Sequence, residues 1–175
     1  VGLGGRFDAT NVVSPLACAI TTIGLDHQEY LGTTLSAIAF EKAGIVKQGV
    51  PVVLGRLGDD AWQTIEQVAR ERQSSVFRLN EDFRTEGEEA RQFSYHGLSA
   101  HYNGLTCSLD GRHQLDNAAC ALALLEAASS QGLTVTAEAV SRGLRTVSWP
   151  GRLEVAGLHP TILLDGAHNP AAATV

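Results

Sequence analysis

The 175-residue chain is poor in cysteine and contains no methionine. Its three cysteines, Cys18, Cys107 and Cys120, are widely spaced and form no Cys-x-x-Cys pair. We therefore expect neither a disulfide framework nor a zinc site, and we expect the reducing cytoplasm as the compartment. The sequence has no apolar run of membrane-spanning length and no visible secretory leader, so a membrane partner is not expected.

Clusters of basic residues are absent too. Lysine and arginine number 13 against 19 acidic residues, which gives a net charge of -6, and the basic residues form no stripe. A nucleic-acid partner is therefore not expected. Anionic ligands remain open, because backbone amides and metal ions bind phosphate locally. The hydrophobic share of 44% is typical of a chain that folds around a core.

A third absence concerns phosphate binding. The sequence has no Gly-x-x-x-x-Gly-Lys-Ser/Thr loop, whose backbone amides cradle nucleotide phosphates. The chain begins abruptly on Val-Gly and stops in a run of small residues. We interpret it as an internal segment of a longer protein, and we expect that the segment alone hydrolyses no nucleotide.

Strand-like and helix-like segments alternate through the first half of the chain. Short apolar runs predict strands, and periodic apolar positions predict helices between them. The expected strands are residues 16–23, 51–54 and 75–79, and the expected helices are 33–43 and 59–72, the second starting on an Asp-Asp cap. This alternation predicts an α/β fold with a parallel sheet and right-handed crossovers.

The pattern changes towards the middle of the chain. Residues 88–109 alternate around glycine turns, which predicts a hairpin or a small antiparallel extension. Residues 115–128 are apolar on nearly every side and predict a buried helix, and 136–146 predict an amphipathic one.

A turn sequence, Trp149-Pro-Gly151, then breaks the pattern. We place a domain boundary there, between residues 1–149 and 150–175. Beyond it we expect strands at 152–156 and 161–164, and a helix that begins at Pro170.

Glycines and polar residues crowd the first eleven positions. The cluster Gly2-Leu-Gly-Gly5 suits a phosphate-binding loop or, equally, a tight turn between strand and helix. Asp8 and Asn11 follow it as candidate substrate contacts, although a helix cap or polar turn explains the same residues.

His27, just after the first predicted strand, and Lys42, on the first predicted helix, are candidate ligand-binding residues. His27 follows the strand at the carboxyl edge of the sheet, where open α/β folds bind ligands. Lys42 shares a helix face with Leu35, Ile38 and Ala39, so its amine should lose solvation and favour the neutral form. A packed histidine, and a lysine whose amine reaches past apolar surface to water, remain alternatives.

Polar residues also gather around the predicted domain boundary. Gln114 and Asn117 open the buried helix, where their amides can both donate and accept hydrogen bonds, or cap the helix. Arg152, Asp165 and His168 come after the boundary. An arginine there can stabilise phosphate charge, but an ordinary surface cation and a turn-forming aspartate are also compatible.

Six short motifs together resemble folylpolyglutamate synthase and the bifunctional dihydrofolate synthase of bacteria, members of the Mur ligase superfamily. They are Gly4-Gly-Arg-Phe-Asp-Ala-Thr-Asn11, Asp26-His27, Glu41-Lys-Ala-Gly44, Gly111-Arg-His-Gln-Leu-Asp-Asn117, Pro150-Gly-Arg-Leu-Glu154 and Asp165-Gly-Ala-His-Asn-Pro170. The resemblance covers most of the chain.

The resemblance implies a division of the fold. Residues 1–149 would be the C-terminal part of a central, P-loop NTPase-like ATP-binding ligase domain, truncated at its N-terminal side. That domain has a mostly parallel sheet, flanking helices and a small antiparallel extension. Residues 150–175 would begin a Rossmann-like, glutamate-binding C-terminal domain.

On the substrate side, the resemblance implies that Asp8 and Asn11 bind the pterin-bearing substrate. His27 and Lys42 would hold Mg²⁺, with Lys42 carrying a carbamate formed from carbon dioxide. A histidine ligand would be unusual, because magnesium prefers oxygen.

On the nucleotide side, the resemblance implies that Asn117, with His113 and Gln114 nearby, recognises the adenine of ATP. Arg152, Asp165 and His168 would reach ATP from the C-terminal domain. Lys42, His27 and Arg152 would be the catalytic residues.

The implied reaction is the addition of L-glutamate to folate and to dihydropteroate, driven by ATP and Mg²⁺ through an acyl phosphate, by a cytoplasmic monomer. Three alternatives remain: a different Mur-type amino-acid ligase, a noncatalytic nucleotide-binding remnant of a ligase, and a dinucleotide oxidoreductase. The last is disfavoured, because Phe7 occupies the final glycine position of the Gly-x-Gly-x-x-Gly fingerprint.

Overall fold

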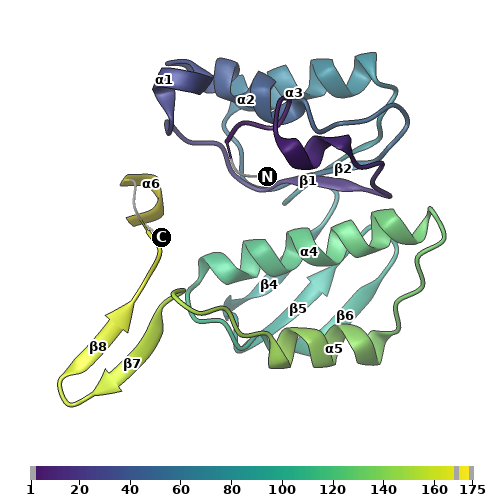
Figure 1. Ribbon diagram of the computed structural model, residues 1–175. Coiled ribbons are helices and arrows are strands. Elements are labelled where there is room, and N and C mark those ends of the chain that lie inside the picture. The colour runs from purple at the N-terminus through teal and green to yellow at the C-terminus, as the bar shows by residue number, and fades with distance from the viewer. Residues whose placement is uncertain (1–2, 168–169, 174–175) are drawn as a thin grey trace.

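A parallel sheet lies at the centre of the N-terminal half. The computed structural model describes residues 3–167 and 170–173 (Figure 1). The sheet has the strand order β1 (Cys18–Ile20), β2 (Val52–Leu54) and β3 (Val76–Arg78). This confirms the expected parallel arrangement, although each strand is shorter than the apolar run that predicted it.

Helices cover one face of this sheet. A 3-10 helix η1 (Ala9–Val12) and a short helix α1 (Gln28–Leu31) lead into α2 (Leu35–Ala43) and α3 (Asp59–Glu71). α2 and α3 lie side by side above the strands (Figure 1). Their small and branched side chains close the smaller of two cores with Val52 and Leu54 of β2.

The helix ends follow from local sequence, with one correction. The Thr34 hydroxyl accepts a hydrogen bond from the Ala37 amide and so caps α2, which ends at Gly44 as expected. The predicted Asp-Asp cap of α3 is wrong. Gly58 is the N-cap, and Asp59 and Asp60 lie in the first turn, where negative charge favours the helix dipole.

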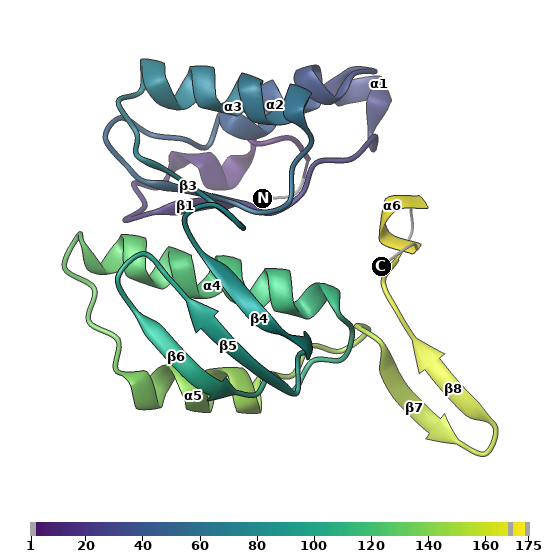
Figure 2. The same ribbon diagram turned by 180° about the vertical axis from the view of Figure 1, so that it is seen from behind.

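α4 (His113–Ser129) lies between the parallel sheet and a second, antiparallel sheet (Figures 1 and 2). That sheet has the strands β4 (Arg84–Glu89), β5 (Gln92–His96) and β6 (His101–Leu105). The predicted antiparallel extension is confirmed, with one strand more than its sequence pattern showed. α5 (Ala137–Thr146) packs beside β6.

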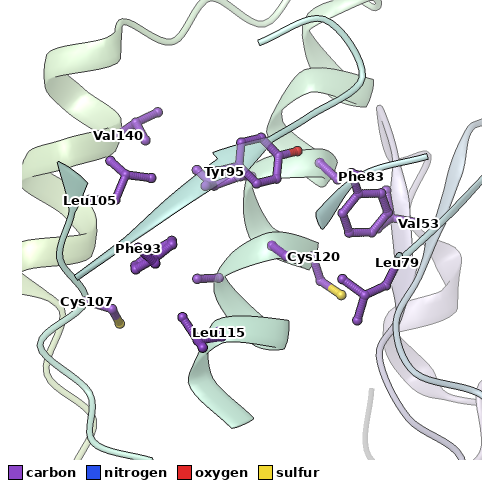
Figure 3. Packing of buried hydrophobic residues seen from close by; sticks show 14 of the residues in the cluster. Val53, Leu79, Phe83, Phe93, Tyr95, Leu105, Cys107, Leu115, Cys120 and Val140 are labelled. Carbon is purple, nitrogen blue, oxygen red and sulfur yellow. The ribbon is translucent and has the colours of Figure 1, made fainter. Parts of the chain in front are cut away.

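The larger core surrounds α4. Tyr95 and Phe93 of β5, Phe83, and Leu115 and Cys120 of α4 are all buried there (Figure 3). Val53 of the parallel sheet also belongs to this core, whereas its neighbours Val52 and Leu54 belong to the other core. The packing around α4 therefore joins the two sheets. The three cysteines are buried and unpaired.

One carboxylate fastens the turn between β5 and β6 to α4. Glu126 accepts hydrogen bonds from the Tyr95 hydroxyl at 2.6 Å and from the Ser99 and Ala100 amides at 2.7 Å each. Burial alone would raise the pKa of Glu126, but these donors outweigh burial and lower it. Burial and the adjacent carboxylate raise the pKa of Tyr95.

The C-terminal segment projects from the rest of the molecule (Figures 1 and 2). β7 (Glu154–Leu158) and β8 (Thr161–Leu164) form an antiparallel hairpin, followed by α6 (Pro170–Ala173). Both strands lie close to their predicted positions, and the boundary at residue 149 stays a prediction. None of the helices described in this structure is both long and apolar enough to cross a bilayer.

Candidate functional site

The backbone of the glycine-rich N-terminal loop is in direct contact with the backbone at the C-terminal end of α2. A Cβ atom added to Gly5 would lie 2.7 Å from the Glu41 carbonyl oxygen, and one added to Gly44 would lie 2.4 Å from Arg6 Cα. The Arg6 amide donates to the Glu41 carbonyl at 2.8 Å. These glycines are therefore required by close packing, whatever else the loop binds.

Asp8 and Asn11 hold this loop in shape. Asp8 is the N-cap of η1 and accepts from the Thr10 amide at 2.8 Å, which is the capping role left open from the sequence. The Asn11 side chain donates to the carbonyls of Arg6 and Gly44. Asp8 also lines a depression of about 380 Å³ with Tyr30 and other residues. Substrate contacts of Asp8 and Asn11 stay predictions.

Lys42 lies in a small depression at the carboxyl end of β1. The depression has a volume of about 220 Å³, and Thr21, Thr22, Gly4 and Ile45 line it with Lys42. Lys42 is half-buried there, in keeping with its position on the apolar stripe of α2. Thr21, Thr22 and Lys42 thus line one depression at the edge of the sheet where ligands are expected.

His27 lies apart from the residues that line this depression. It is the N-cap of α1, its side chain is 51% exposed, and its Nε2 atom lies 3.9 Å from the Asp26 carboxylate. Within residues 3–167 and 170–173, no three His, Cys, Asp or Glu side chains are grouped so that they could hold a metal ion. The metal-binding roles of His27 and Lys42 stay predictions.

A larger cleft brings together four of the residues proposed for nucleotide binding. Gln114 and Asn117 line it from α4, and Arg152 and Asp165 line it from the C-terminal segment. Its volume is about 610 Å³, which is large enough for a nucleoside-sized ligand. We call it the α4–hairpin cleft. His168 lies outside the described residues.

The α4 wall of the cleft is a hydrogen-bonded row. Asn117 Nδ2 donates to Gln114 Oε1 at 2.9 Å, and Gln114 Nε2 lies 3.0 Å from His113 Nε2. Gln114 is only 5% exposed, whereas Asn117 is exposed to the cleft. Asn117 is thus the member of this row that is exposed to a ligand in the cleft.

The opposite wall is a tight turn built on Asp165. Its carboxylate accepts from the Leu153 amide at 2.9 Å and from the Ala167 amide at 2.7 Å, and these bonds lower the pKa of Asp165. The Gly166 amide donates to the Gly151 carbonyl. Asp165 is thus a turn former, as one alternative held, and it stays ionised at the mouth of the same cleft as Arg152.

Sequence reasoning missed one residue of this cleft and one ion pair that lies outside it. Trp149 was interpreted only as a domain boundary, yet its ring is 62% exposed and lines the cleft, where it can cover a planar ligand. The pair Arg56 and Asp116 was missed because it joins distant segments. Arg56 follows β2 and contacts Asp116 of α4 at 3.0 and 3.2 Å.

The chain is similar to proteins of known activity, although no protein-family model matches it. It is 42% identical over 177 residues to the dihydrofolate synthase/folylpolyglutamate synthase of Bacillus subtilis strain 168, a match that covers 96% of this chain and 40% of that protein. It is 36% identical over 175 residues to the folylpolyglutamate synthase of Lacticaseibacillus casei, covering 97% of this chain and 41% of that protein.

Solved structures agree. An FPGS–AMPPCP–folate complex superposes with a TM-score of 0.93 at 36% identity, over 99% of this chain and 44% of that one. The structure of E. coli FolC in complex with DHPP and ADP gives a TM-score of 0.86 at 33% identity, over 99% of this chain and 40% of that one.

These matches extend over nearly the whole chain, so the chain is homologous to ligase enzymes and shares their α/β fold. The chain belongs to the folylpolyglutamate synthase/dihydrofolate synthase family and spans about 40% of the length of the curated relatives it matches. The resemblance of the six motifs is thereby confirmed.

Proposed function

We propose that this chain is part of an ATP-dependent ligase that adds L-glutamate to folate and to dihydropteroate. The α4–hairpin cleft carries the proposal. It brings Gln114 and Asn117 opposite Arg152 and Asp165, although the two pairs are far apart in the sequence. Relatives were solved with AMPPCP and folate and with ADP and DHPP, which supports a nucleotide in the cleft and a pterin substrate beyond it.

The proposed chemistry has two steps. A substrate carboxylate oxygen attacks the γ-phosphorus of ATP, so that an acyl phosphate forms and ADP leaves. The glutamate nitrogen then attacks the acyl carbon, phosphate leaves, and the nitrogen gives up its proton. Arg152 is proposed to stabilise the phosphate charge that builds up in the first step.

Lys42 is proposed to act as a carbamate. Its neutral amine would attack carbon dioxide, forming a nitrogen–carbon bond and releasing one proton. As an ammonium group Lys42 does not fit a magnesium site, because two like charges would repel. The carbamate would supply the hard oxygen that Mg²⁺ prefers, in the depression that Thr21 and Thr22 also line. We propose Mg²⁺ as the cofactor that accompanies ATP, with His27 as a further ligand.

The test is a glutamate-addition assay on the protein expressed from its complete gene. We expect ADP and phosphate to appear only when folate or dihydropteroate, L-glutamate, ATP and Mg²⁺ are all present, and to disappear with EDTA. Arg152→Ala should lower kcat by at least about 100-fold. The surface variant Arg70→Ala, whose side chain pairs with Glu66 on α3, should leave kcat unchanged.

Other results of the same assay would favour one of the alternative functions. ATP binding without phosphate release would favour a noncatalytic nucleotide-binding protein. Turnover with another amino acid and no pterin substrate would favour a different Mur-type ligase. We also propose a monomer in the cytoplasm, which size-exclusion chromatography and cell fractionation would check.

A further inference from the structure

A pair of histidines lies on the face of the antiparallel sheet that is turned away from α4. Phe93 and Tyr95 of β5 are buried in the larger core, so the alternate residue His96 belongs to the opposite face of the strand. His101 is its direct partner on β6. Figure 2 views the sheet from this side, with α4 behind the strands.

The tight turn beyond the pair brings the two imidazoles together. The Gly97 amide donates to the Ala100 carbonyl at 2.8 Å, so these two residues form the hydrogen-bonded pair that closes the turn. The next pair, His96 and His101, is therefore a non-hydrogen-bonded one, and the side chains of such pairs lie closest together. The two ring centroids are 4.3 Å apart. Two ring nitrogens can thus reach the separation of about 3.3 Å at which both bind one tetrahedral metal ion.

Each imidazole also has an oxygen beside its Nε2 atom. His96 Nε2 is buried without a formal hydrogen bond, yet it lies 3.2 Å from Glu86 Oε2, and Arg84 holds the other oxygen of that carboxylate at 3.0 Å. His101 Nε2 lies 2.9 Å from Oδ1 of Asn103, whose exposed amide can turn to present this oxygen. Metal-binding histidines show the same pattern, in which the nitrogen away from the metal donates to a carboxylate or carbonyl oxygen. The Nδ1 atom of each ring is then the one available to a metal ion.

We propose that His96 and His101 bind one divalent transition-metal ion, such as Zn²⁺, through their Nδ1 atoms. Imidazole nitrogen suits Zn²⁺, Cu²⁺ and Ni²⁺, whereas Mg²⁺ prefers oxygen. No third His, Cys, Asp or Glu side chain of the described residues is grouped with the pair, so water completes the coordination. Cysteine spacing gave no sign of this site, because both ligands are histidines.

The bound ion would cross-link β5 to β6 beside the turn that Glu126 fastens to α4. Because the ion binds the folded chain, it should stabilise that chain against unfolding. The inference is independent of the proposed ligase function, since neither histidine lines the α4–hairpin cleft or the depression around Lys42.

The experiment titrates ZnCl₂ into the protein expressed from its complete gene, without an affinity tag and in excess Mg²⁺, by isothermal calorimetry. We expect His96→Gln and His101→Gln each to lose one Zn²⁺ site per chain. His159→Gln, which removes an exposed histidine elsewhere, should lose none. Glu86→Gln removes the charge beside His96 and should weaken the same site about tenfold. Zn²⁺ should raise the melting temperature of the wild type more than that of His101→Gln.

A spectroscopic measurement distinguishes metal ligands from residues that only support the sheet. The electron paramagnetic resonance spectrum of the wild type with Cu²⁺ should show two imidazole nitrogens at this site, and that of His101→Gln should show at most one. An equal number of Zn²⁺ sites in the wild type and His101→Gln would overturn the proposal. So would an equal loss in His159→Gln, which would indicate scattered binding by surface histidines.

Two further outcomes are also decisive. If His96→Gln does not fold, His101→Gln decides the question, because its side chain is exposed. A wild type that binds no Zn²⁺ would refute this inference and leave the proposed ligase function untouched.

Discussion

Glu126 joins two parts of the molecule through a single side chain. Its carboxylate accepts bonds from Tyr95, from the Leu98, Ser99 and Ala100 amides, and from the Ser99 hydroxyl. A neutral amide in its place would direct an NH₂ group at a set of donors. We expect Glu126→Gln to lower the free energy of unfolding by about 2 kcal/mol in urea titrations at neutral pH. Glu88→Gln, on the exposed face of β4, should change it by less than about 0.5 kcal/mol.

The same contacts predict a pH dependence. The pKa of Glu126 is lower in the folded than in the unfolded chain, so its contribution is complete above the unfolded pKa, about 4.3, and is lost as the pH falls through the folded one. The stability difference between wild type and Glu126→Gln should therefore shrink in acid. A difference that stays constant from neutral pH into strong acid would contradict this assignment.

At the same scale, some site residues could be predicted from sequence and others could not. The half-burial of Lys42 followed from its place on an apolar helix stripe. Glu126 gave no such pattern, because its partners are about thirty residues away and three of them are backbone amides. The contact of Gln114 with both His113 and Asn117 depends on side-chain orientations, which only the structure supplies.

Elements with a regular apolar pattern were predicted well. α3 was predicted to within one residue, because its buried positions recur with helical spacing. It lies at Asp59–Glu71 and is one residue shorter than expected. β4 was missed because Arg84–Glu89 is almost entirely charged or exposed, so no alternation marks it. Its position comes from pairing with β5, a contact between segments that the local pattern does not encode.

The contact between the N-terminal loop and α2 leads to a prediction at this scale. Gly44 has an ordinary helical φ of -58°, so a side chain there meets no backbone strain, but its Cβ atom would lie 2.4 Å from both Cα and Cβ of Arg6. Gly44→Ala should displace the loop and lower the free energy of unfolding by about 1–3 kcal/mol. It should also break the 2.6 Å pair between Arg6 and Glu41.

A second glycine serves as a control, because replacing it with alanine should raise the free energy of unfolding. Gly143 lies within α5 with open space at its Cβ position, so Gly143→Ala should stabilise the chain by about 0.5–1 kcal/mol. Thermal unfolding of the two variants checks both values. Equal shifts in the same direction would show that the close approach of the loop to α2 does not constrain position 44.

At the scale of the whole molecule, the cleft and the core depend on different parts of the chain. Both cores are built from residues before the hairpin. The large side chains of the hairpin, by contrast, are exposed, with Val155 at 53% and Leu158 at 71%. Arg152 and Asp165, which flank the hairpin, line the cleft, so the C-terminal segment that matters most for the proposed ligand contributes little apolar burial.

Shortening the chain tests this separation. A chain that ends at Trp149 should unfold cooperatively, with a free energy within about 1 kcal/mol of the 175-residue chain, because no buried side chain of either core is removed. A chain that ends at Gln131 also loses α5, whose Val140 is 6% exposed in the larger core, and should lose cooperative unfolding. Urea titration followed by circular dichroism distinguishes the two. If the chain ending at Trp149 unfolded like the shorter one, the hairpin would be part of the folding unit, and the proposed boundary at residue 149 would be wrong.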